Sequence, residues 1–287
     1  MTTRRVFFKN AGMGLLASSA ASVLLCEDLC ANPSAEQEKT QKNDMFKIAI
    51  AGYSFVHFDT DKMLEMMKRT GVKYLCIKNF HLPYEANKEE CDAFNEKLKS
   101  YGVTGYGIGP VNSITTEQML DDTFEYAKRA NVKLIVAGAP DEKLLPYIDK
   151  KVKEYDFKFA IHNHGPGDPK YPNAKSIWDK VNDFDPRIGM CLDIGHNVRT
   201  GADLVADLKK YHKRIFDIHI KDVTAADKEG TEIEIGRGII DIPTFVKTLR
   251  KVKYNGACSL EHEKDMRDPL AGIAESIGYF KGVMAAI

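Results

Sequence analysis

The sequence predicts an α/β protein folded as a single (β/α)8 TIM barrel. Eight short runs rich in β-branched and aromatic residues alternate with longer amphipathic runs between residues 46 and 287. Eight strand–helix units of this size close one parallel barrel and leave little room for a second domain. An open, doubly wound sheet is the alternative, but the first predicted strand runs into AGYSFVHFD and not into the GxGxxG of a phosphate-binding loop.

The predicted strands follow one another along the chain at regular intervals. They are FKIAIAGYSF (46–55), VKYLCIKNFHL (72–82), VTGYGIGPV (103–111), VKLIVAGAP (132–140), FKFAIHNHG (157–165), IGMCLDIGH (188–196), IFDIHIKD (215–222) and GACSLEHE (256–263). The clearest helices between them are DTDKMLEMMKRTG (59–71), KEECDAFNEKLKSYG (88–102) and TTEQMLDDTFEYAKRAN (115–131), each ending at Gly or Asn. Thr115 and Gln118 predict a capping box at the start of the third helix.

The N-terminal segment reads as an export signal. We expect residues 1–34 to be the signal peptide, residues 35–45 a polar linker and residues 46–287 the barrel. The consecutive arginines of TTRRVFFKN precede an apolar run of about fifteen residues, which is short for a membrane span. This pattern resembles a twin-arginine signal, which implies a periplasmic protein with no stable membrane span after processing. An ordinary Sec signal and a lipoprotein are the alternatives.

Composition points to a small-molecule ligand. Lys and Arg together number 41, as do Asp and Glu, and the isoelectric point is near 7.1. This balance provides no basic field to attract nucleic acid or an anionic membrane. The cysteines Cys76, Cys91, Cys191 and Cys258 are far apart in the sequence and are expected to be buried small side chains, not disulfides. The sequence leaves a homo-oligomer possible without specifying one.

Chemically active side chains gather at the ends of the last four predicted strands. In a TIM barrel, the carboxyl ends of the strands build the active site. Because side chains alternate along a strand, the residues of one parity are expected to face the same volume. The strand-end residues are His162, Asn163 and His164; Asp193 and His196; Asp217, His219, Lys221 and Asp222; and Ser259, Glu261, His262 and Glu263.

A metal ion accounts best for this cluster. Burying so many uncompensated charges would cost several kcal/mol each, whereas one divalent cation satisfies several together. A nitrogen and oxygen ligand set without thiolate suits Mn²⁺, Co²⁺, Zn²⁺ or Fe²⁺. Single residues have simpler explanations: Asp222, His212 and Asp185 are expected to satisfy caps or loop amides, and His262 and Asn163 to face the helices.

Four motifs resemble one known superfamily. CLDIGH, DIHIKD, EIGRGIID and CSLEHE are similar to the xylose isomerase-like TIM barrels, which include sugar phosphate isomerases and epimerases. The resemblance covers the chain from Phe46 onward. It implies a divalent metal held by a strand-five residue together with Asp193, His219 and Glu261. It further implies that His196 lies beside the substrate and that Arg237 contacts it.

One position departs from the pattern of many members of this superfamily. They carry a Glu on strand five, where this chain has FAIHNH, so that His162 takes the ligand position. A metal-bound imidazole cannot transfer protons as that Glu does in the epimerases. The histidine resembles the inosose dehydratase branch instead, and CIKNFHLP, with Lys78 and His81 as substrate contacts, resembles secreted Bacteroidetes members associated with keto-glycoside breakdown.

The chemistry shared by these branches is proton abstraction beside a carbonyl. A metal that binds a carbonyl and an adjacent hydroxyl stabilises the enediolate. Returning the proton elsewhere makes an isomerase or epimerase, which is the expected activity; expelling a β-oxygen makes a dehydratase or hydratase, which is the alternative. Candidate proton carriers are His164, His196, Glu263 and Lys221, the last with a lowered pKa if a cation is near. For an exported protein, a free sugar or keto-sugar is the expected substrate.

Two other classes of function remain open on the sequence alone. A barrel related to the zinc-dependent apurinic-site endonucleases would need more metal ligands and a basic groove, which the even charge disfavours. A non-catalytic sugar-binding barrel would line its pocket with aromatic residues. Tyr53, Phe55, Phe80 and Tyr106 offer such a lining, although packing at the barrel mouth explains them equally well.

Overall fold

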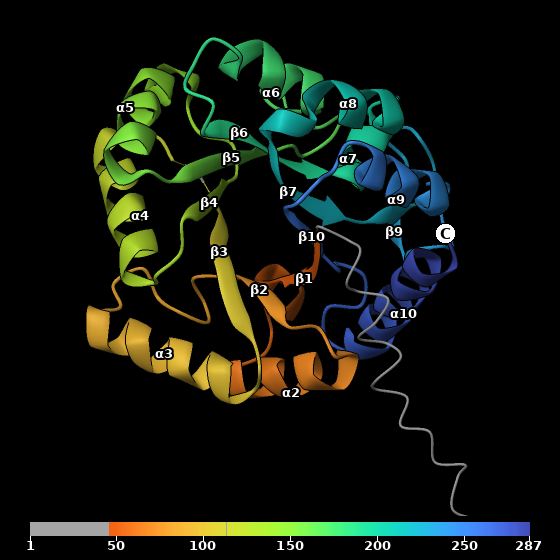
Figure 1. Ribbon diagram of the computed structural model, residues 1–287, viewed down its shortest axis with the longest axis horizontal. Helices are drawn as coiled ribbons and strands as arrows, with labels where there is room; N and C mark the ends of the chain where they lie inside the picture. Colours follow the sequence, from red (N-terminus) through yellow and green to blue (C-terminus); the bar gives the residue numbers. More distant parts are fainter. Residues whose placement is uncertain (1–45, 113) are drawn as a thin grey trace, which may run out of the picture. The chain divides into compact units, whose positions relative to one another are not determined.

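The barrel prediction is confirmed. The computed structural model describes residues 46–112 and 114–287, in which eight parallel strands close in the order β1-β10-β7-β6-β5-β4-β3-β2 (Figure 1). The strands are β1 (Lys47–Ala51), β2 (Tyr74–Ile77), β3 (Thr104–Val111), β4 (Leu134–Ala137), β5 (Lys158–His162), β6 (Ile188–Asp193), β7 (Ile215–Ile220) and β10 (Ala257–Leu260).

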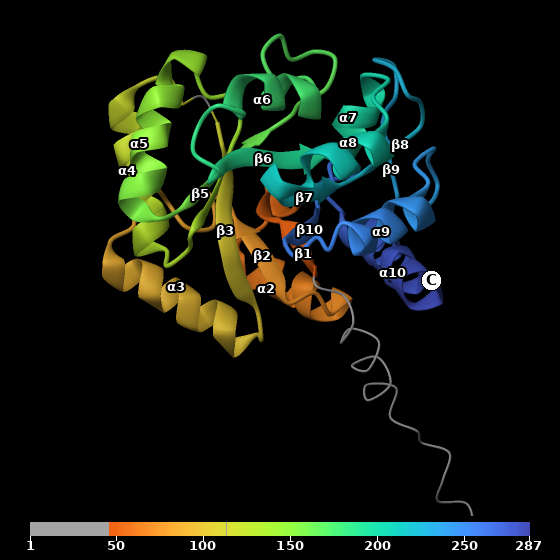
Figure 2. The same cartoon turned by 45° about the horizontal axis from the view of Figure 1, so that its top comes forward.

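Helices surround the strands (Figures 1 and 2). They are α2 (Thr60–Thr70), α3 (Lys88–Ser100), α4 (Glu117–Arg129), α5 (Leu145–Tyr155), α6 (Ala174–Val181), α7 (Ile194–Arg199), α8 (Leu204–Tyr211), α9 (Ile242–Lys251) and α10 (Leu270–Ala286), with short 3-10 helices η2 (Gly52–Phe55), η3 (Glu142–Leu144) and η4 (His212–Arg214). Between β7 and α9 the chain forms a small antiparallel pair, β8 (Asp222–Val223) and β9 (Glu232–Ile233). This pair holds residues beside the site.

Side chains cap the start of α2, α3 and α4, whereas α5 and α10 have no side-chain cap. Asp59 caps α2, which ends at Gly71 in the left-handed conformation, φ 66°. The capping box predicted from Thr115 and Gln118 is wrong. The hydroxyl of Thr116 accepts the Met119 N–H at 3.2 Å, because the helix begins one residue later, and the Gln118 amide instead donates to Asp122.

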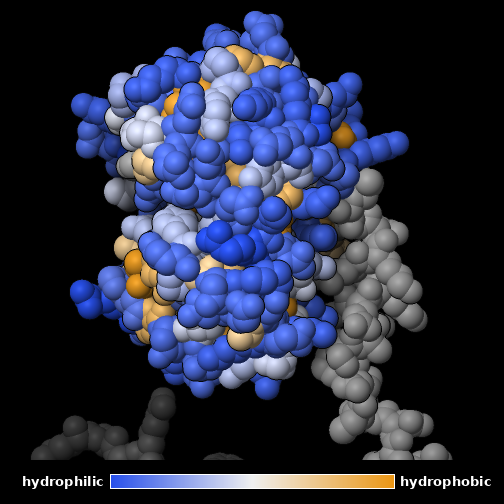
Figure 3. Space-filling model, turned by 90° about the vertical axis from the view of Figure 1, so that its left-hand side faces the viewer, coloured by the Kyte–Doolittle hydropathy of each residue, from blue (hydrophilic) through white to orange (hydrophobic). Residues whose placement is uncertain are grey.

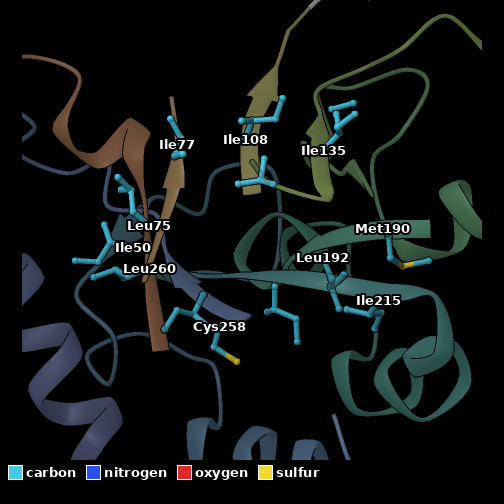
Figure 4. Close-up of a cluster of buried hydrophobic side chains, with 14 of the residues drawn as sticks. Ile50, Leu75, Ile77, Ile108, Ile135, Met190, Leu192, Ile215, Cys258 and Leu260 are labelled. Carbon is cyan, nitrogen blue, oxygen red and sulfur yellow. The ribbon is translucent and has the colours of Figure 1, made fainter. Parts of the chain in front are cut away.

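Strand alternation divides the side chains between core and site. Outward-facing residues of the strands join one large apolar cluster with the helices, and ten of them are labelled in Figure 4. In β6, Met190 and Leu192 belong to this cluster, whereas Cys191 and Asp193 have the opposite parity. The four cysteines Cys76, Cys91, Cys191 and Cys258 are fully buried, as predicted.

Several N-terminal expectations lie outside the described residues, namely the signal peptide at 1–34 and the linker at 35–45. Within residues 46–112 and 114–287, no helix has the length and apolar character needed to cross a membrane. The face seen in Figure 3 is mostly hydrophilic, with small separate apolar patches. A homo-oligomer remains a prediction.

Candidate metal centre and active site

Four residues predicted as metal ligands meet inside the carboxyl end of the barrel. His162 ends β5, Asp193 ends β6, His219 lies in β7 and Glu261 directly follows β10. Asp193 and His219 are register partners across β6 and β7, so their side chains point into the barrel side by side. All four residues are buried. The outward parity is occupied by residues such as Ile161 and Leu192, which pack against the helices.

The donor atoms of these residues converge on one point. One donor atom from each lies within 4.8 Å of all the others. His162 Nε2 is 3.0 Å from His219 Nδ1, 3.7 Å from Asp193 Oδ2 and 3.8 Å from Glu261 Oε2. His219 Nδ1 is 3.1 Å from Glu261 Oε2. Donors around a tetrahedral metal with bonds of about 2.1 Å are about 3.4 Å apart, so this spacing fits a single ion.

The CLDIGH motif explains how Asp193 is presented. Its Oδ1 accepts the His196 N–H at 2.7 Å and thereby caps α7. The Asn163 side chain holds the same strand end through Asp193 N and Asp193 O, at 2.9 and 3.0 Å. Asp193 Oδ2 is buried and accepts no hydrogen bond in the described structure, with the Lys221 ammonium 3.5 Å away as its nearest positive charge. A buried carboxylate oxygen without a partner is costly, and a cation at the convergence point would satisfy it.

Charge around the ligands favours a cation as well. Burial, together with the neighbouring His219, holds the pKa of His162 well below its ordinary value, so this imidazole is neutral and able to coordinate. Burial raises the pKa of Glu261, but His219 and Lys221 outweigh it and lower that pKa well below 4.5. Burial would lower the pKa of His219, but Glu261 and Asp217 outweigh it and raise that pKa above 6.5, so a metal would have to displace the proton of this imidazole when it binds.

A second layer of polar groups lies beneath His219. Asp217 Oδ2 is 3.9 Å from His219 Nε2 and accepts the Tyr106 hydroxyl at 2.9 Å. Burial raises the pKa of Asp217 to about 6. At this distance the two groups do not form a hydrogen bond, but the nearby charge of Asp217 favours a more basic His219. Tyr106 therefore belongs to this buried network and not to a sugar-stacking surface.

We expect Asp217→Asn to weaken metal binding without removing a ligand. The amide cannot supply the charge that polarises His219, so the affinity for Zn²⁺ or Mn²⁺ should fall by about 10–100-fold. Competition titration against a chelating dye measures this change. Asp185→Asn is the control, because Asp185 binds Arg187 far from the ligands. Equal affinities in wild type and Asp217→Asn would exclude this role for Asp217.

Lys221 lies between the ligands and two further carboxylates. Its Nζ is 3.5 Å from Asp193 Oδ2, 3.3 Å from Glu261 Oε2 and 3.9 Å from Glu232 Oε2, and it donates a hydrogen bond to Glu263. Burial would lower its pKa, but Asp193, Glu261 and Glu263 raise it well above 10.5. Among protein groups alone, the pKa of Lys221 thus moves in the direction opposite to the expected lowering. A charged Lys221 is suited to stabilise an oxyanion.

His162, Asp193, His219 and Glu261 are called the ligand cluster below. A cavity of ≈ 370 Å³ opens next to this cluster. Its lining consists of His196, Arg199, Lys221, Val223, Gly230, Thr231, Glu232, Glu263 and Lys264. Arg199 Nε is buried without an acceptor in the described structure, while another Arg199 nitrogen lies 3.4 Å from His196 Nδ1. The cavity therefore holds groups of both charges within reach of the ligand cluster, and its size suits a monosaccharide-sized ligand.

His164 and His196, two of the predicted proton carriers, lie close together. The ring centroids of His164 and His196 are 6.1 Å apart, and that of His164 is 4.6 Å from that of His162. His164 Nδ1 lies 3.4 Å from Asp168 Oδ2. Burial lowers the pKa of His196. Gly165, with φ 82°, turns the chain here, and a Cβ at this position would lie 3.2 Å from His196 Nδ1.

The three predicted substrate contacts have different surroundings. Lys78 is buried and donates to the Pro110 carbonyl, with its ammonium 5.6 Å from the Tyr53 ring. His81 packs against Phe80, and burial lowers its pKa to about 4. The guanidinium of Arg237 pairs with Glu275 on α10, and Arg237 does not line the cavity beside His196. Substrate contact by these three residues remains a prediction.

Several structural expectations hold. The Asp222 carboxylate accepts backbone N–H groups of Gly236, Gly238 and Ile240, and so organises the loop before α9. The His262 ring lies against α10, where a Cβ on Gly272 would come within 2.5 Å of it. These residues support the site without facing the ligand cluster.

Glu232 and Arg199 were missed by the sequence interpretation. Both line the cavity, but neither follows a barrel strand directly: Arg199 ends α7 and Glu232 lies in β9. A weak signal existed in EIEIG, where Glu232 and Glu234 alternate with isoleucine. Such alternation is typical of a short strand, but it does not specify the pairing with β8 that sets the position of Glu232.

Curated relatives share parts of the chain. The inosose dehydratase of Clostridium beijerinckii is 22% identical over 266 residues, covering 81% of this chain and 85% of that protein. The rhizopine catabolism protein MocC of Rhizobium meliloti is 32% identical over 94 residues. That shorter match covers 28% of this chain and only 29% of MocC.

Solved structures share the fold at low sequence identity. The IolI protein, crystallised with a bound zinc atom, has a TM-score of 0.67 at 16% identity, covering 83% of this chain and 98% of its own. An L-ribulose 3-epimerase has a TM-score of 0.66 at 12% identity, covering 83% and 94%. A family model, described as xylose isomerase-like TIM barrel, matches residues 48–283. Since that match spans every barrel strand from β1 to β10 except the first residue, the chain belongs to the xylose isomerase-like TIM barrel family.

Proposed function

We propose that the protein is a metal-dependent carbon–oxygen lyase that eliminates a β-oxygen from a keto-sugar. The observation that carries this proposal is the ligand cluster itself, in which His162 and His219 stand beside Asp193 and Glu261. A divalent metal bound there would act as a Lewis acid that polarises the substrate carbonyl. The match to an inosose dehydratase over most of both chains supports elimination as the outcome.

The protein groups provide the proton transfers. The Asp168 carboxylate lies 3.4 Å from His164 Nδ1 without a hydrogen bond, and its charge favours the tautomer whose proton is on Nδ1, which leaves Nε2 free to accept the α-proton. His196 has its Nδ1 beside Arg199, which leaves its Nε2–H to donate a hydrogen bond to the oxygen that gains charge. Lys221, held charged by carboxylates, adds a second positive group.

An epimerase or isomerase is the second candidate. Groups that can carry protons flank the cluster on two sides: His164 and His196 follow β5 and β6, while Lys221 and Glu263 follow β7 and β10. Proton removal on one side with return on the other would invert a carbon centre without loss of oxygen.

We further propose a free keto-sugar as the substrate and export as its context. The cavity lining includes the carboxylates Glu232 and Glu263 as well as Arg199 and Lys264. These carboxylates can accept hydrogen bonds from the hydroxyl groups of a free sugar. The twin-arginine pattern at the N-terminus is compatible with a substrate found outside the cytoplasm.

The function is tested by NMR in deuterated water with the Mn²⁺- or Zn²⁺-loaded protein. The probes are 2-keto-myo-inositol and methyl 3-keto-glucoside. Loss of water or methanol beside the carbonyl is the expected result; for Mn²⁺ samples, the metal is removed before the spectrum is recorded. Deuterium gain with the carbon–oxygen framework intact would favour the epimerase, and no reaction with either probe would contradict both.

His164→Asn is expected to lower the rate of α-proton exchange by about 10²–10⁴-fold, because the base is removed. Metal content should stay at the wild-type level, since His164 is outside the ligand set. Mass spectrometry of deuterium uptake and metal analysis measure the two quantities. His212→Asn is the matched control, because His212 lies in η4 on the outside of the barrel and bonds the Lys209 carbonyl. An unchanged exchange rate in His164→Asn would remove His164 from the mechanism.

A further inference from the structure

Glu232 is a partly buried carboxyl group on the wall of the cavity, outside the barrel strands. It starts β9, whose antiparallel pairing of Glu232 with Val223 in β8 holds this side chain in place. Its side chain is 13% exposed and lines the cavity together with His196, Lys221 and Glu263. None of the predicted roles uses this residue, although it lies beside Lys221, which contacts the ligands Asp193 and Glu261.

The partners of Glu232 come from the ends of β7 and β10. Its two oxygens accept the Glu263 backbone N–H at 2.9 and 3.0 Å, and Oε1 lies 3.5 Å from His262 Nδ1. The Lys221 ammonium is 3.9 Å from Oε2. Burial raises the pKa of Glu232 to about 7; Lys221 lowers it, while the charges of Glu263 and Glu261 raise it further. Near neutral pH this carboxyl group therefore exists in both protonation states.

We propose that Glu232 is the catalytic acid that protonates the departing oxygen of the substrate. This inference rests on the lyase function proposed above. His164 takes the α-proton, and the electrons of that C–H bond form the new carbon–carbon double bond. The carbon–oxygen bond at the β-carbon breaks, its electrons stay on oxygen, and the Glu232 proton converts that oxygen into water or an alcohol. Glu232 is left as a carboxylate that regains a proton from solvent, so no oxidant or reductant is needed.

A purely structural role for Glu232 makes a different prediction. In that case the carboxylate only accepts the Glu263 N–H and fixes the strand end. Glu232→Gln separates the two roles, because the amide oxygen still accepts that hydrogen bond while the amide group cannot donate an acidic proton. Glu234→Gln is the matched control: Glu234 lies two residues further on, pairs with Lys264 and lines a different cavity near α10.

The experiment follows exchange and elimination separately, with the metal-loaded full chain, 2-keto-myo-inositol and deuterated water. In Glu232→Gln we expect elimination to fall by about 100-fold or more while α-proton exchange continues near the wild-type rate. Wild-type elimination should decline as pH rises through about 7, because the protonated carboxyl is the active form, and Glu232→Gln should lack this decline. Glu234→Gln should match the wild type in both reactions.

The outcomes distinguish failure of this inference from failure of the proposed function. Elimination at the wild-type rate in Glu232→Gln would overturn the role of Glu232 alone. Parallel loss of exchange, elimination and thermal stability in Glu232→Gln would likewise overturn it in favour of the structural role. Absence of both exchange and elimination in the wild type would overturn the lyase function, and the acid role of Glu232 with it.

Discussion

Asp193→Asn is expected to abolish metal binding and to lower turnover by about 10³-fold or more, while the barrel stays folded. The substitution acts on one oxygen. Asn Oδ1 can still accept the His196 N–H and cap α7, but the group replacing Oδ2 becomes an amide that donates hydrogens. It then lies 3.7 Å from His162 Nε2 and 3.5 Å from the Lys221 ammonium, which it cannot compensate in charge. A metal would lose both a bond and a negative charge.

Metal analysis after dialysis, together with the rate of keto-sugar turnover, checks this expectation. Wild type should retain one equivalent of metal and Asp193→Asn almost none. Asp203→Asn provides the control, because Asp203 caps α8 in the same manner, through the Ala206 N–H at 3.0 Å, away from the cluster. Stoichiometric metal in Asp193→Asn would show that Asp193 Oδ2 is not a ligand.

The fold could be predicted because its rules are local and periodic. Alternation in IGMCLD assigns Cys191 and Asp193 to one face, and Met190 and Leu192 to the other. The same alternation, applied to β5, β7 and β10, predicted that His162, His219 and Glu261 face one volume, and the resemblance to the superfamily distinguished them as ligands from their neighbours on the same faces. Helix starts were predictable to within about one residue. The cap of α4 was predicted at Thr115 but lies at Thr116, because the hydroxyls of two adjacent threonines are nearly equivalent as caps.

The cavity could be predicted less well, because its walls come from outside the repeating units. The β8–β9 pair depends on a register between two segments of two residues each, which no periodicity specifies. Glu232 was missed for this reason. Arg237 illustrates the same limit: Glu275 on α10 pairs with its guanidinium, which the sequence did not predict, and its contact with substrate remains a prediction. Long-range pairing of that kind leaves no mark on the local sequence.

Electrostatics were the least predictable property. Lys221 was expected to have a lowered pKa beside a cation, yet the carboxylates around it raise that pKa among the protein groups. Its neighbours come from β6, β9 and the end of β10, so their summed effect depends on distances that only the folded chain supplies. Lys221 thereby offsets much of the negative charge that the metal would also offset.

Lys221→Met is therefore expected to lower the free energy of unfolding of the chelator-treated protein by about 3–5 kcal/mol. The methionine fills a similar volume but leaves the carboxylates of Asp193, Glu261 and Glu263 without their shared cation. Urea denaturation in EDTA measures the loss. Lys151→Met is the matched control: Lys151 is also buried, but its partners Asp121 and Glu154 have side chains 37% and 51% exposed, so that water compensates them.

The free energy of unfolding should change with pH in opposite directions in the chelator-treated wild type and in Lys221→Met. In the chelated wild type, the folded-state pKa of Glu261 lies below 4.5, so its contribution is present above the unfolded-state pKa and is lost as pH falls. In Lys221→Met, burial and mutual repulsion should instead raise the carboxyl pKa values above their unfolded values. Stability is then lost as pH rises and partly regained on acidification. Equal unfolding free energies at pH 5 and pH 8 in the variant would contradict this account.

Metal addition completes the test, because a divalent cation and the Lys221 ammonium offset the same charges. Zn²⁺ or Mn²⁺ should therefore stabilise Lys221→Met by more than it stabilises the wild type, and should bind the variant more tightly. Thermal unfolding at a series of metal concentrations measures both effects. Equal stabilisation of the two proteins by the metal would show that Lys221 does not share the carboxylates of Asp193 and Glu261 with the ion. It would then contradict the assignment of these carboxylates as metal ligands.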